Sequence, residues 1–411
     1  MLDRRAALRG VGGALALAAP GLLPRPARAA AGALLPPGLP QGLYGAAVLG
    51  ALPGKVPLIK LSYRPPNYET PIAYFDRVFT PNDAFFVRYH LAGIPDRLDA
   101  DAWKVRIGGE AVATPLELSL ADLKGGFEQV ELAAVCQCSG NRRGFSDPHV
   151  PGVQWGPGAM GNALWRGVRL KDVLAKAGLR KEALVVVVNG ADGPVLDATP
   201  DFVKSLPLWK ALDENTLIAH TMNGEPLPRL NGFPVRLIVP GWASTYWMKH
   251  LDSVEVTTRP FDGFFVKTAY RVPKGKFPLV DRFVEQEDAT STPDTELVVN
   301  SLITAPTDGA EVRTGQPVEV RGVAWDGGYG IVSVLVSGDG GESWREAALG
   351  QDHGRFSFRP WSLTLRFDGP GRRTVLAKAT NAVGQTQTRS LVFNASGYCN
   401  NVPLPVTVAV S

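Results

Sequence analysis

The alternation of hydrophobic and polar positions divides the chain into two parts that are built differently. Up to about residue 290 it predicts short strands mixed with short helical segments. The strands are expected at 103–107, 130–135 and 183–188, and the helical segments at 119–124 and 168–177. In the second helical segment apolar residues recur at helical spacing, and Gly178 ends the pattern. This mixture predicts an α+β domain.

After about Thr295 the pattern changes to short apolar strands that are separated by turn residues. The expected strands are 296–301, 317–325, 331–337, 374–380 and 386–393. Asp339-Gly340-Gly341 is typical of a hairpin turn. Short strands with frequent turns are typical of an immunoglobulin-like β-sandwich. We therefore expect two domains, 45–285 and 293–411, that are joined by a connecting arm.

Composition supports an ordinary globular protein of two domains. The chain has 411 residues, of which 45% are hydrophobic and 20% are charged. Its formal net charge is +4, and five arginines against one aspartate within residues 1–30 account for all of it. Because the rest of the chain is about neutral, no basic face for nucleic-acid binding is expected.

Residues 1–31 have the pattern of a cleavable export signal. Arg4-Arg5 precede a mildly apolar run, and Ala27-Arg28-Ala29 offers a small-x-small cleavage site. The arginine pair resembles a twin-arginine signal, although Asp3 stands before it in place of Ser or Thr. A general secretory signal or a disordered tail is the alternative. No stretch is long and apolar enough for a stable membrane span, so we expect a periplasmic protein.

Cys138 is the first candidate for chemistry. It follows the apolar segment 132–135, and the turn residues Ser139-Gly140-Asn141 indicate that the strand ends there. Arg142 and Arg143 come next. Guanidinium groups beside a thiol favour the metal-binding thiolate, and they also bind oxyanions. The pattern predicts a metal–thiolate centre for a small anion; the alternative is a buried cysteine beside solvated arginines.

The segment Phe85–His90 is a second candidate. It is predicted as a strand whose alternation places Phe86, Arg88 and His90 on one face. This arrangement sets a guanidinium beside an imidazole, which is a cationic pair able to handle a proton. The alternative is an ordinary polar face of a strand.

Four segments resemble the sulfite oxidase family, whose cysteine ligates the molybdenum of a molybdopterin cofactor. Cys138-Ser-Gly-Asn-Arg-Arg143 resembles its Cys-x-Gly-Asn-Arg-Arg signature, and Phe85–His90 resembles a segment that reaches the metal. Residues 223–236 match its Asn-Gly-x-Pro-Leu-Pro and Gly-Phe-Pro-Val-Arg pattern. Residues 337–344 resemble its second domain, which often mediates dimerisation. Within the family, the bacterial periplasmic sulfite dehydrogenases are the most similar.

The resemblance implies roles for individual residues. Cys138 would be the protein's metal ligand. Arg88 and Arg143 would hold the oxygens of sulfite, while His90 and Tyr270 would form hydrogen bonds at the metal centre and help to move a proton. The implied cofactor-binding residues are Phe86, Arg88, His90, Cys138, Asp192, Asn231, Arg236, Trp247 and Lys249.

Two positions depart from the vertebrate members of the family. Asn231 stands where they have a histidine, and Ser396 stands where they have an arginine of the substrate pocket. Cys136 and Cys399 are left over, either as free thiols or as a pair.

The activity implied is the oxidation of sulfite to sulfate at a molybdenum–molybdopterin centre. Because the sequence has no Cys-x-x-Cys-His motif for covalent haem, the electrons are expected to pass to a separate c-type cytochrome. Two alternatives remain open. One is a molybdenum oxidoreductase for another small S- or N-oxyanion or S-oxide, and the other is an exported, non-enzymatic β-rich binding protein. A homodimer and a heterodimer with a cytochrome subunit are both compatible with the sequence.

Overall fold

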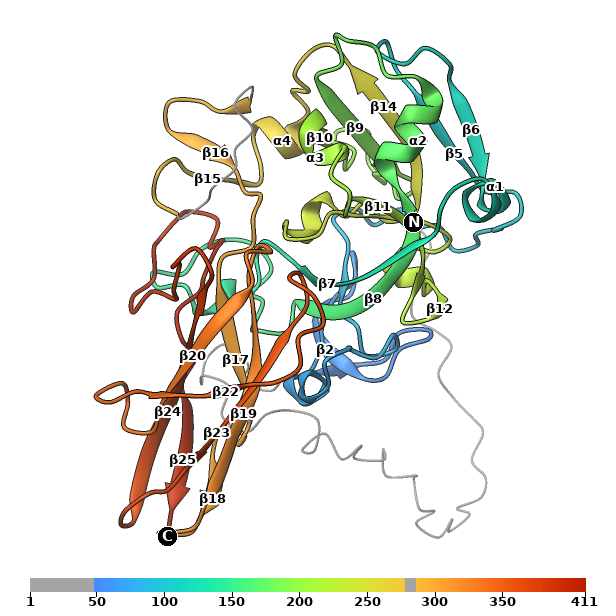
Figure 1. The fold of residues 1–411 in the computed structure, drawn as a ribbon. Coiled ribbons are helices and arrows are strands. Elements are labelled where there is room, and N and C mark those ends of the chain that lie inside the picture. Colours follow the sequence, from blue (N-terminus) through green and yellow to red (C-terminus); the bar gives the residue numbers. More distant parts are fainter. Residues whose placement is uncertain (1–47, 278–285) are drawn as a thin grey trace, which may run out of the picture.

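The computed structural model describes residues 48–277 and 286–411, which form a mixed first part and a β-sandwich (Figure 1). This confirms the α+β domain and the sandwich that follows it. Strands far outnumber helices within the described residues. The expected export signal, residues 1–31, lies outside the described residues. Within the residues described, no helix is long and apolar enough to cross a membrane.

A small antiparallel sheet opens the first part. Its order is β1 (Leu49–Gly50), β2 (Leu58–Ser62), β3 (Asn67–Glu69) and β4 (Val87–Arg88), and the 3-10 helix η2 (Ile72–Asp76) follows β3. The expected strand at 85–90 is therefore too long, because only two of its residues pair. Arg88 pairs with Asn67, so the next partner, that of Tyr89, is Pro66. A proline has no N–H to donate, which ends the ladder.

A second sheet carries the expected strand at 130–135. Its order is β12 (Glu225–Pro226), β11 (Leu217–Met222), β8 (Met160–Arg169) and β7 (Val130–Gln137), and β13 (Arg236–Ile238) also pairs with β11. β7 and β8 are antiparallel over the full length of β7, with Gln137 opposite Met160. Cys138 therefore follows the last paired residue of β7, as predicted.

A third sheet has the order β10 (Lys204–Pro207), β9 (Val185–Gly190), β14 (Leu251–Thr257), β5 (Lys104–Gly108) and β6 (Leu116–Ser119). The helices of the first part are α1 (Leu120–Gly125), α2 (Leu170–Ala177), α3 (Leu208–Ala211) and α4 (Phe264–Lys267). α2 begins two residues later than predicted, because Val168 belongs to β8. It ends as predicted at Gly178, whose φ of 72° is the left-handed conformation that glycine favours.

The sandwich follows a two-stranded connection between β15 (Arg271–Pro273) and β16 (Ser291–Pro293). One sheet has the order β17 (Asn300–Ala305), β19 (Val318–Trp325), β23 (Arg359–Leu365) and β22 (Ala348–Leu349). The other has the order β18 (Ala310–Val312), β25 (Val406–Val410), β24 (Gly371–Asn381), β20 (Ile331–Ser337) and β21 (Arg345–Glu346). The predicted hairpin turn at Asp339 joins β20 to β21, which pair antiparallel.

The expected strand at 386–393 is wrong, because this segment contains only an isolated bridge between Thr386 and Thr380. The reason lies in Gln387. Its side-chain oxygen accepts the N–H of Ala379 at 2.9 Å, which is a bond that a continuing strand would have made with its own backbone. The chain then leaves the sheet towards the first part of the molecule.

The two parts share a hydrophobic core. Phe75, Met160 and Ala243 of the first part pack in one buried cluster with Trp325 and Phe358 of the sandwich. The indole Nε1 of Trp325 also donates to Gln137 Oε1 at 2.7 Å, at the end of β7. The sandwich is therefore packed directly against the strand that leads to Cys138.

Candidate functional site

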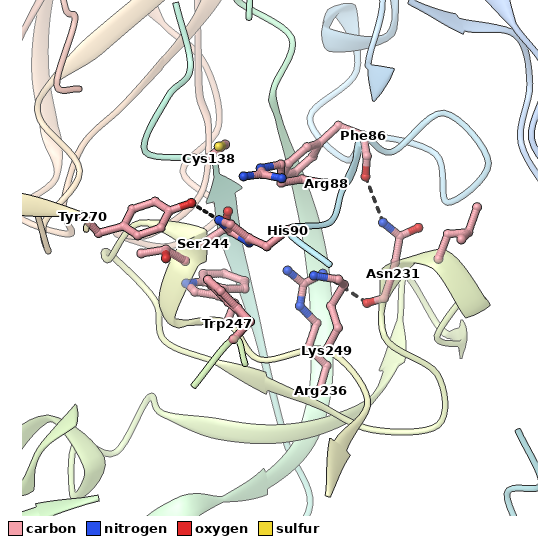
Figure 2. A pocket seen from close by; sticks show the side chains of 13 residues that line it. Phe86, Arg88, His90, Cys138, Asn231, Arg236, Ser244, Trp247, Lys249 and Tyr270 are labelled. Carbon is pink, nitrogen blue, oxygen red and sulfur yellow. Dashed lines mark hydrogen bonds between the residues drawn. The ribbon is translucent and has the colours of Figure 1, made fainter. Parts of the chain in front are cut away.

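A pocket of about 470 Å³ lies where the end of β7 meets β4 and the loop between β13 and β14 (Figure 2). Most of the site residues expected from the sequence line it. The full lining consists of Phe86, Arg88, His90, Cys138, Phe202, Leu230, Asn231, Arg236, Ser244, Thr245, Trp247, Lys249 and Tyr270.

Cys138 is held at the pocket by its backbone. Its N–H donates to the carbonyl of Ala159 at 2.9 Å, and its own carbonyl accepts the N–H of Asn141 at 2.9 Å. The Gly-rich loop that contains Ala159 is anchored by the buried carboxylate of Glu69, which accepts from the N–H groups of Gly156 and Gly158 at 2.7 and 3.0 Å. The thiol is therefore fixed between two rigid segments.

Arg88 brings a permanent positive charge to the same end of the pocket. Its Nη1 donates to Asn67 Oδ1 at 3.1 Å and also to the carbonyl of Tyr89. Burial opposes the charge, but the neighbouring Tyr270 and Cys138 raise the pKa of Arg88 above its ordinary value. The guanidinium therefore stays charged and can hold an anion beside Cys138.

His90 and Tyr270 form the proton-handling pair of this end. His90 Nε2 and the Tyr270 hydroxyl form a hydrogen bond, which Figure 2 shows. Burial, followed by the charges of Arg88 and Lys249, lowers the pKa of His90 well below its ordinary value, so the imidazole is neutral at pH 7. Burial raises the pKa of Tyr270, which keeps the phenol protonated.

Tyr270 has a backbone φ of 59°. This left-handed conformation is rare for a bulky residue, and such strain is concentrated at functional sites. The structure maintains it partly through the N–H of Asp294, which donates to the Tyr270 carbonyl at 2.8 Å.

The other end of the pocket collects cations around Asn231, at the end of the 3-10 helix η4 (Arg229–Asn231). Arg236 Nη1 donates to the Asn231 carbonyl at 3.1 Å, and Asn231 Nδ2 donates to the carbonyl of Phe86 at 3.0 Å (Figure 2). Lys55, from the N-terminal sheet region, donates to Asn231 Oδ1 at 2.5 Å. Burial lowers the pKa of Lys249 to about 8, although Asp192 opposes the shift.

These residues fit an anionic, phosphate-bearing cofactor. Arg88 Nε, Arg236 Nε and Thr245 Oγ1 are buried and have no hydrogen-bond partner within the described structure. Buried donors without partners are costly, so a ligand rich in acceptors is expected to satisfy them. Bidentate guanidinium groups such as that of Arg236 match phosphate well.

The protein alone does not supply a complete metal site. Across residues 48–277 and 286–411, no group of three or more His, Cys, Asp or Glu side chains could hold an ion. A metal bound by Cys138 would therefore take most of its ligands from a non-protein molecule. A metal-carrying organic cofactor fits both this single thiol and the cation-rich end of the pocket.

Two expected site residues do not line the pocket. Arg143, in the 3-10 helix η3 (Arg143–Phe145), donates Nε to the Ser396 carbonyl at 2.7 Å and Nη1 to the Val153 carbonyl at 3.1 Å. Asp192 is buried behind the lining and interacts electrostatically with Lys249. Neither side chain lines the pocket, but each acts on it electrostatically, Asp192 on Lys249 and Arg143 on His90 and Tyr270.

The remaining two cysteines do not form a disulfide. Cys136 Sγ accepts a hydrogen bond from Arg236 Nη2 at 3.2 Å, and Cys399 Sγ lies 3.2 Å from Asp294 Oδ1. Cys136 therefore helps to hold the guanidinium that faces the cofactor end.

Sequence reasoning missed four lining residues, namely Phe202, Leu230, Ser244 and Thr245. Ser244 and Thr245 belong to the 3-10 helix η5 (Ser244–Tyr246), only a few residues before Lys249, so their proximity to it was a usable signal. Phe202 stacks on the imidazole of His90 with ring centroids 3.9 Å apart, which no local pattern indicates.

Comparison with known proteins agrees with this geometry. The family described as "Oxidoreductase molybdopterin binding domain" matches residues 90–265, and "Mo-co oxidoreductase dimerisation domain" matches residues 291–411. The mitochondrial sulfite oxidase of Homo sapiens is 36% identical over 376 residues, which cover 87% of this chain and 67% of that protein. The sulfite oxidase of Arabidopsis thaliana is 30% identical over 386 residues, which cover 87% of this chain and 96% of that protein.

A solved structure extends the likeness to the fold. The sulfane dehydrogenase SoxCD from Paracoccus pantotrophus matches with a TM-score of 0.72 and 25% identity, over 90% of each chain. The chain spans about two thirds of the length of its mammalian relatives, 67% for the human protein and 65% for the rat protein. On these matches, the chain belongs to the sulfite oxidase family of molybdopterin oxidoreductases.

Proposed function

We propose that this protein oxidises sulfite to sulfate at a molybdenum–molybdopterin centre bound in the pocket. The observation that carries the proposal is the convergence of Cys138, Arg88, His90 and Tyr270 at one end of a single pocket. When bound, the cofactor would supply the oxygen atom and accept the two electrons of the reaction. Cys138 would be its protein ligand.

The chain's own residues bind and orient the substrate. Arg88 is half-buried and charged, so it attracts a sulfite anion and offsets the charge of the sulfate that forms. Neutral His90 can accept or hold a proton at a ring nitrogen, while the Tyr270 hydroxyl can donate one. Since both groups line the pocket, they can move the protons of the water that replaces the transferred oxygen.

The cofactor's phosphate end would lie at Arg236, Lys249 and Asn231. Arg236 is the main phosphate ligand of the proposal, because its Nε has no protein partner and its other nitrogens are fixed by Cys136 and Asn231. The indole of Trp247 lies beside this guanidinium, with the Arg236 Cζ atom 5.8 Å from the ring centroid.

We also propose that the electrons pass to a c-type cytochrome and that the protein acts in the periplasm. The arginine pair and apolar run within residues 1–31 support export by the twin-arginine pathway. The given sequence carries no Cys-x-x-Cys-His motif for covalent haem, and a separate c-type cytochrome is the acceptor that this proposal names.

A second candidate is the oxidation of another sulfur compound in the same pocket. The likeness to a sulfane dehydrogenase over 90% of each chain favours it. Ser396 also removes the arginine that vertebrate family members carry at this position, which reduces the positive charge available to an oxyanion. A pocket with less positive charge binds the sulfite dianion less well, and it therefore suits a sulfane substrate better.

The test begins with molybdenum and pterin analysis of the purified mature protein. Reduction of cytochrome c is then followed with sulfite, with a sulfane-sulfur donor and with nitrite in separate assays, and Cys138→Ser serves as the control that lacks the thiolate ligand. Molybdenum with sulfite-dependent reduction supports the main proposal. Molybdenum with activity only on the sulfane donor favours the second candidate, and protein without molybdenum from a competent host would overturn both.

A further inference from the structure

The described structure brings a residue of the sandwich to the back of the pocket. Tyr398 lies between β24 and β25 and is only 7% exposed. Its ring stacks on that of Tyr270 with centroids 5.5 Å apart and planes inclined by 2°. Parallel, offset stacking at this distance is favourable and restricts rotation of both rings.

Tyr398 is itself held firmly. Its N–H donates to Asn394 Oδ1 at 3.1 Å, and Asn394 Nδ2 returns a bond to the Tyr398 carbonyl at 2.9 Å. The preceding Gly397 has a φ of 61°, and a Cβ added there would lie 2.8 Å from Arg143 Cγ. The turn therefore needs a glycine to bring Tyr398 this close to the pocket.

The Cys138 segment is tied to the same turn. Arg143 donates Nε to the carbonyl of Ser396, and its Cζ atom lies 5.2 Å from the centroid of the Tyr398 ring. From the turn that contains both Cys138 and Arg143, contacts thus run through the Arg143 guanidinium and the Tyr398 ring to Tyr270. They link the segment that carries Cys138 to the phenol at the same end of the pocket.

Tyr270 needs such support, because its strained backbone does not fix the ring by itself. The hydroxyl reaches His90 only if the ring keeps its present orientation (Figure 2). On one side of the pocket Phe202 stacks on His90, and at the back Tyr398 stacks on Tyr270. Each member of the proton-handling pair is therefore stacked face to face on one aromatic ring, while Phe265 packs at an angle against both.

We propose that Tyr398, supplied by the sandwich domain, is a positioning residue that holds the Tyr270 phenol towards His90 during catalysis. The sandwich is thereby part of the active site and not only an assembly module. This inference rests on the proposed function for its kinetic consequences, but the orientation of Tyr270 is independent of the substrate. The ring of Tyr398 is the essential element, and its hydroxyl is dispensable.

The test compares Tyr398→Phe, which keeps the ring, with Tyr398→Leu, which removes it. Both are made in the native background and in Tyr270→Phe, and cofactor content is measured for each. We expect Tyr398→Phe to stay within about threefold of the native kcat, and Tyr398→Leu to lose roughly 10- to 100-fold, as misplaced catalytic groups do. In the Tyr270→Phe background, Tyr398→Leu should cause little further loss.

A structural role alone would give the same loss in both backgrounds, and that result would overturn the proposal. If Tyr398→Leu is too unstable to purify, Tyr398→Met keeps more of the buried volume and is read in the same way. A crystal structure of the ring-less variant gives a readout without any substrate. A Tyr270 hydroxyl still bonded to His90 there would also overturn the proposal, whereas a native protein inactive on sulfite would count only against the proposed function.

Discussion

The guanidinium of Arg142 donates Nη2 to the carbonyl of Ser301 at 2.7 Å, across the boundary between the first part and the sandwich. Arg142 has no exposed surface, and its Nη1 donates to the Val402 carbonyl at 3.2 Å. Burial lowers the pKa of Arg142 to about 9. Arg142 is thus a buried residue that connects the two parts of the molecule, and it is not a solvated charge.

We predict that Arg142→Ala destabilises the protein by about 3 kcal/mol. The change leaves the Ser301 and Val402 carbonyls without their donor and opens a cavity beside Trp325, and each effect is costly in a buried place. Thermal unfolding of purified protein measures it. Arg106→Ala is the matched control, because Arg106 is largely exposed and pairs only with Asp252, so about 0.5 kcal/mol or less is expected. Equal shifts in the two variants would contradict the prediction.

The adjacent residues Arg142 and Arg143 show what could not be predicted from the sequence. The motif around Cys138 singled out a thiol that lines the pocket, and Phe86, Arg88 and His90, which the alternation predicted on one face, line it as well. The sequence pattern could not distinguish Arg142 and Arg143 from arginines that bind a substrate. Their partners include the backbone carbonyls of Ser396 and Val402, more than two hundred residues away, and only the packing of the sandwich brings these near.

The predictions of two strands, 85–90 and 386–393, were wrong for a related reason. Pro66 shortens the strand at Arg88, and the side chain of Gln387 replaces a backbone bond after β24. Both effects come from a partner segment that a local hydrophobic pattern does not reveal. By contrast, the end of α2 at Gly178 depends only on local conformation, and it was predicted correctly.

We predict that Arg88→Met raises the KM for sulfite by roughly 10- to 100-fold. The loss of one charged hydrogen bond to an anion costs about 1.5–3 kcal/mol, which corresponds to that range. Steady-state kinetics with sulfite measure it, and molybdenum content and melting temperature show whether the fold and cofactor remain. Arg88→Lys keeps the positive charge but loses the planar donors, so its KM should lie between that of the native protein and that of Arg88→Met. An unchanged KM would exclude Arg88 from substrate binding.

We predict that Lys55→Met weakens retention of the cofactor by about tenfold. Lys55 Nζ donates to Asn231 Oδ1 and to the Asn82 carbonyl, each at 2.5 Å, so it orients the carboxamide that lines the cation-rich end. Burial lowers the pKa of Lys55 to about 7, although Asp83 opposes the shift, so its positive charge is only partly present at neutral pH. The loss of an ordinary buried hydrogen bond, about 1 kcal/mol, is therefore enough to account for the magnitude. The readout is the pterin remaining after extended gel filtration, measured by fluorescence of the released and oxidised pterin.

Lys60→Met is the control for Lys55, because Lys60 contacts the exposed ring of Tyr63 and is not part of the pocket. Its pterin content should match that of the native protein. If both variants retain the cofactor equally well, Lys55 contributes nothing to its binding.

We predict that His250 makes the fold sensitive to mild acid. Its Nδ1–H donates to the Phe233 carbonyl at 2.7 Å, so Nε2 accepts from the Tyr89 hydroxyl at 2.7 Å. Burial lowers the pKa of His250 to about 3. Between its unfolded pKa of about 6.5 and this value the unfolded chain binds the extra proton, so stability falls as the pH falls.

At pH 5 the loss from His250 amounts to about 2 kcal/mol relative to neutral pH, at 1.36 kcal/mol for each pH unit below 6.5. His250→Asn removes the titration, and Asn tolerates the φ of 51° at this position. The variant should be less stable than the native protein at pH 7, because it loses the hydrogen bonds to Tyr89 and Phe233. Unfolding followed at pH 7, 6 and 5 should show this gap narrowing, since only the native protein pays for protonation of the unfolded chain. A gap that stays constant over this range would mean that another group sets the acid sensitivity.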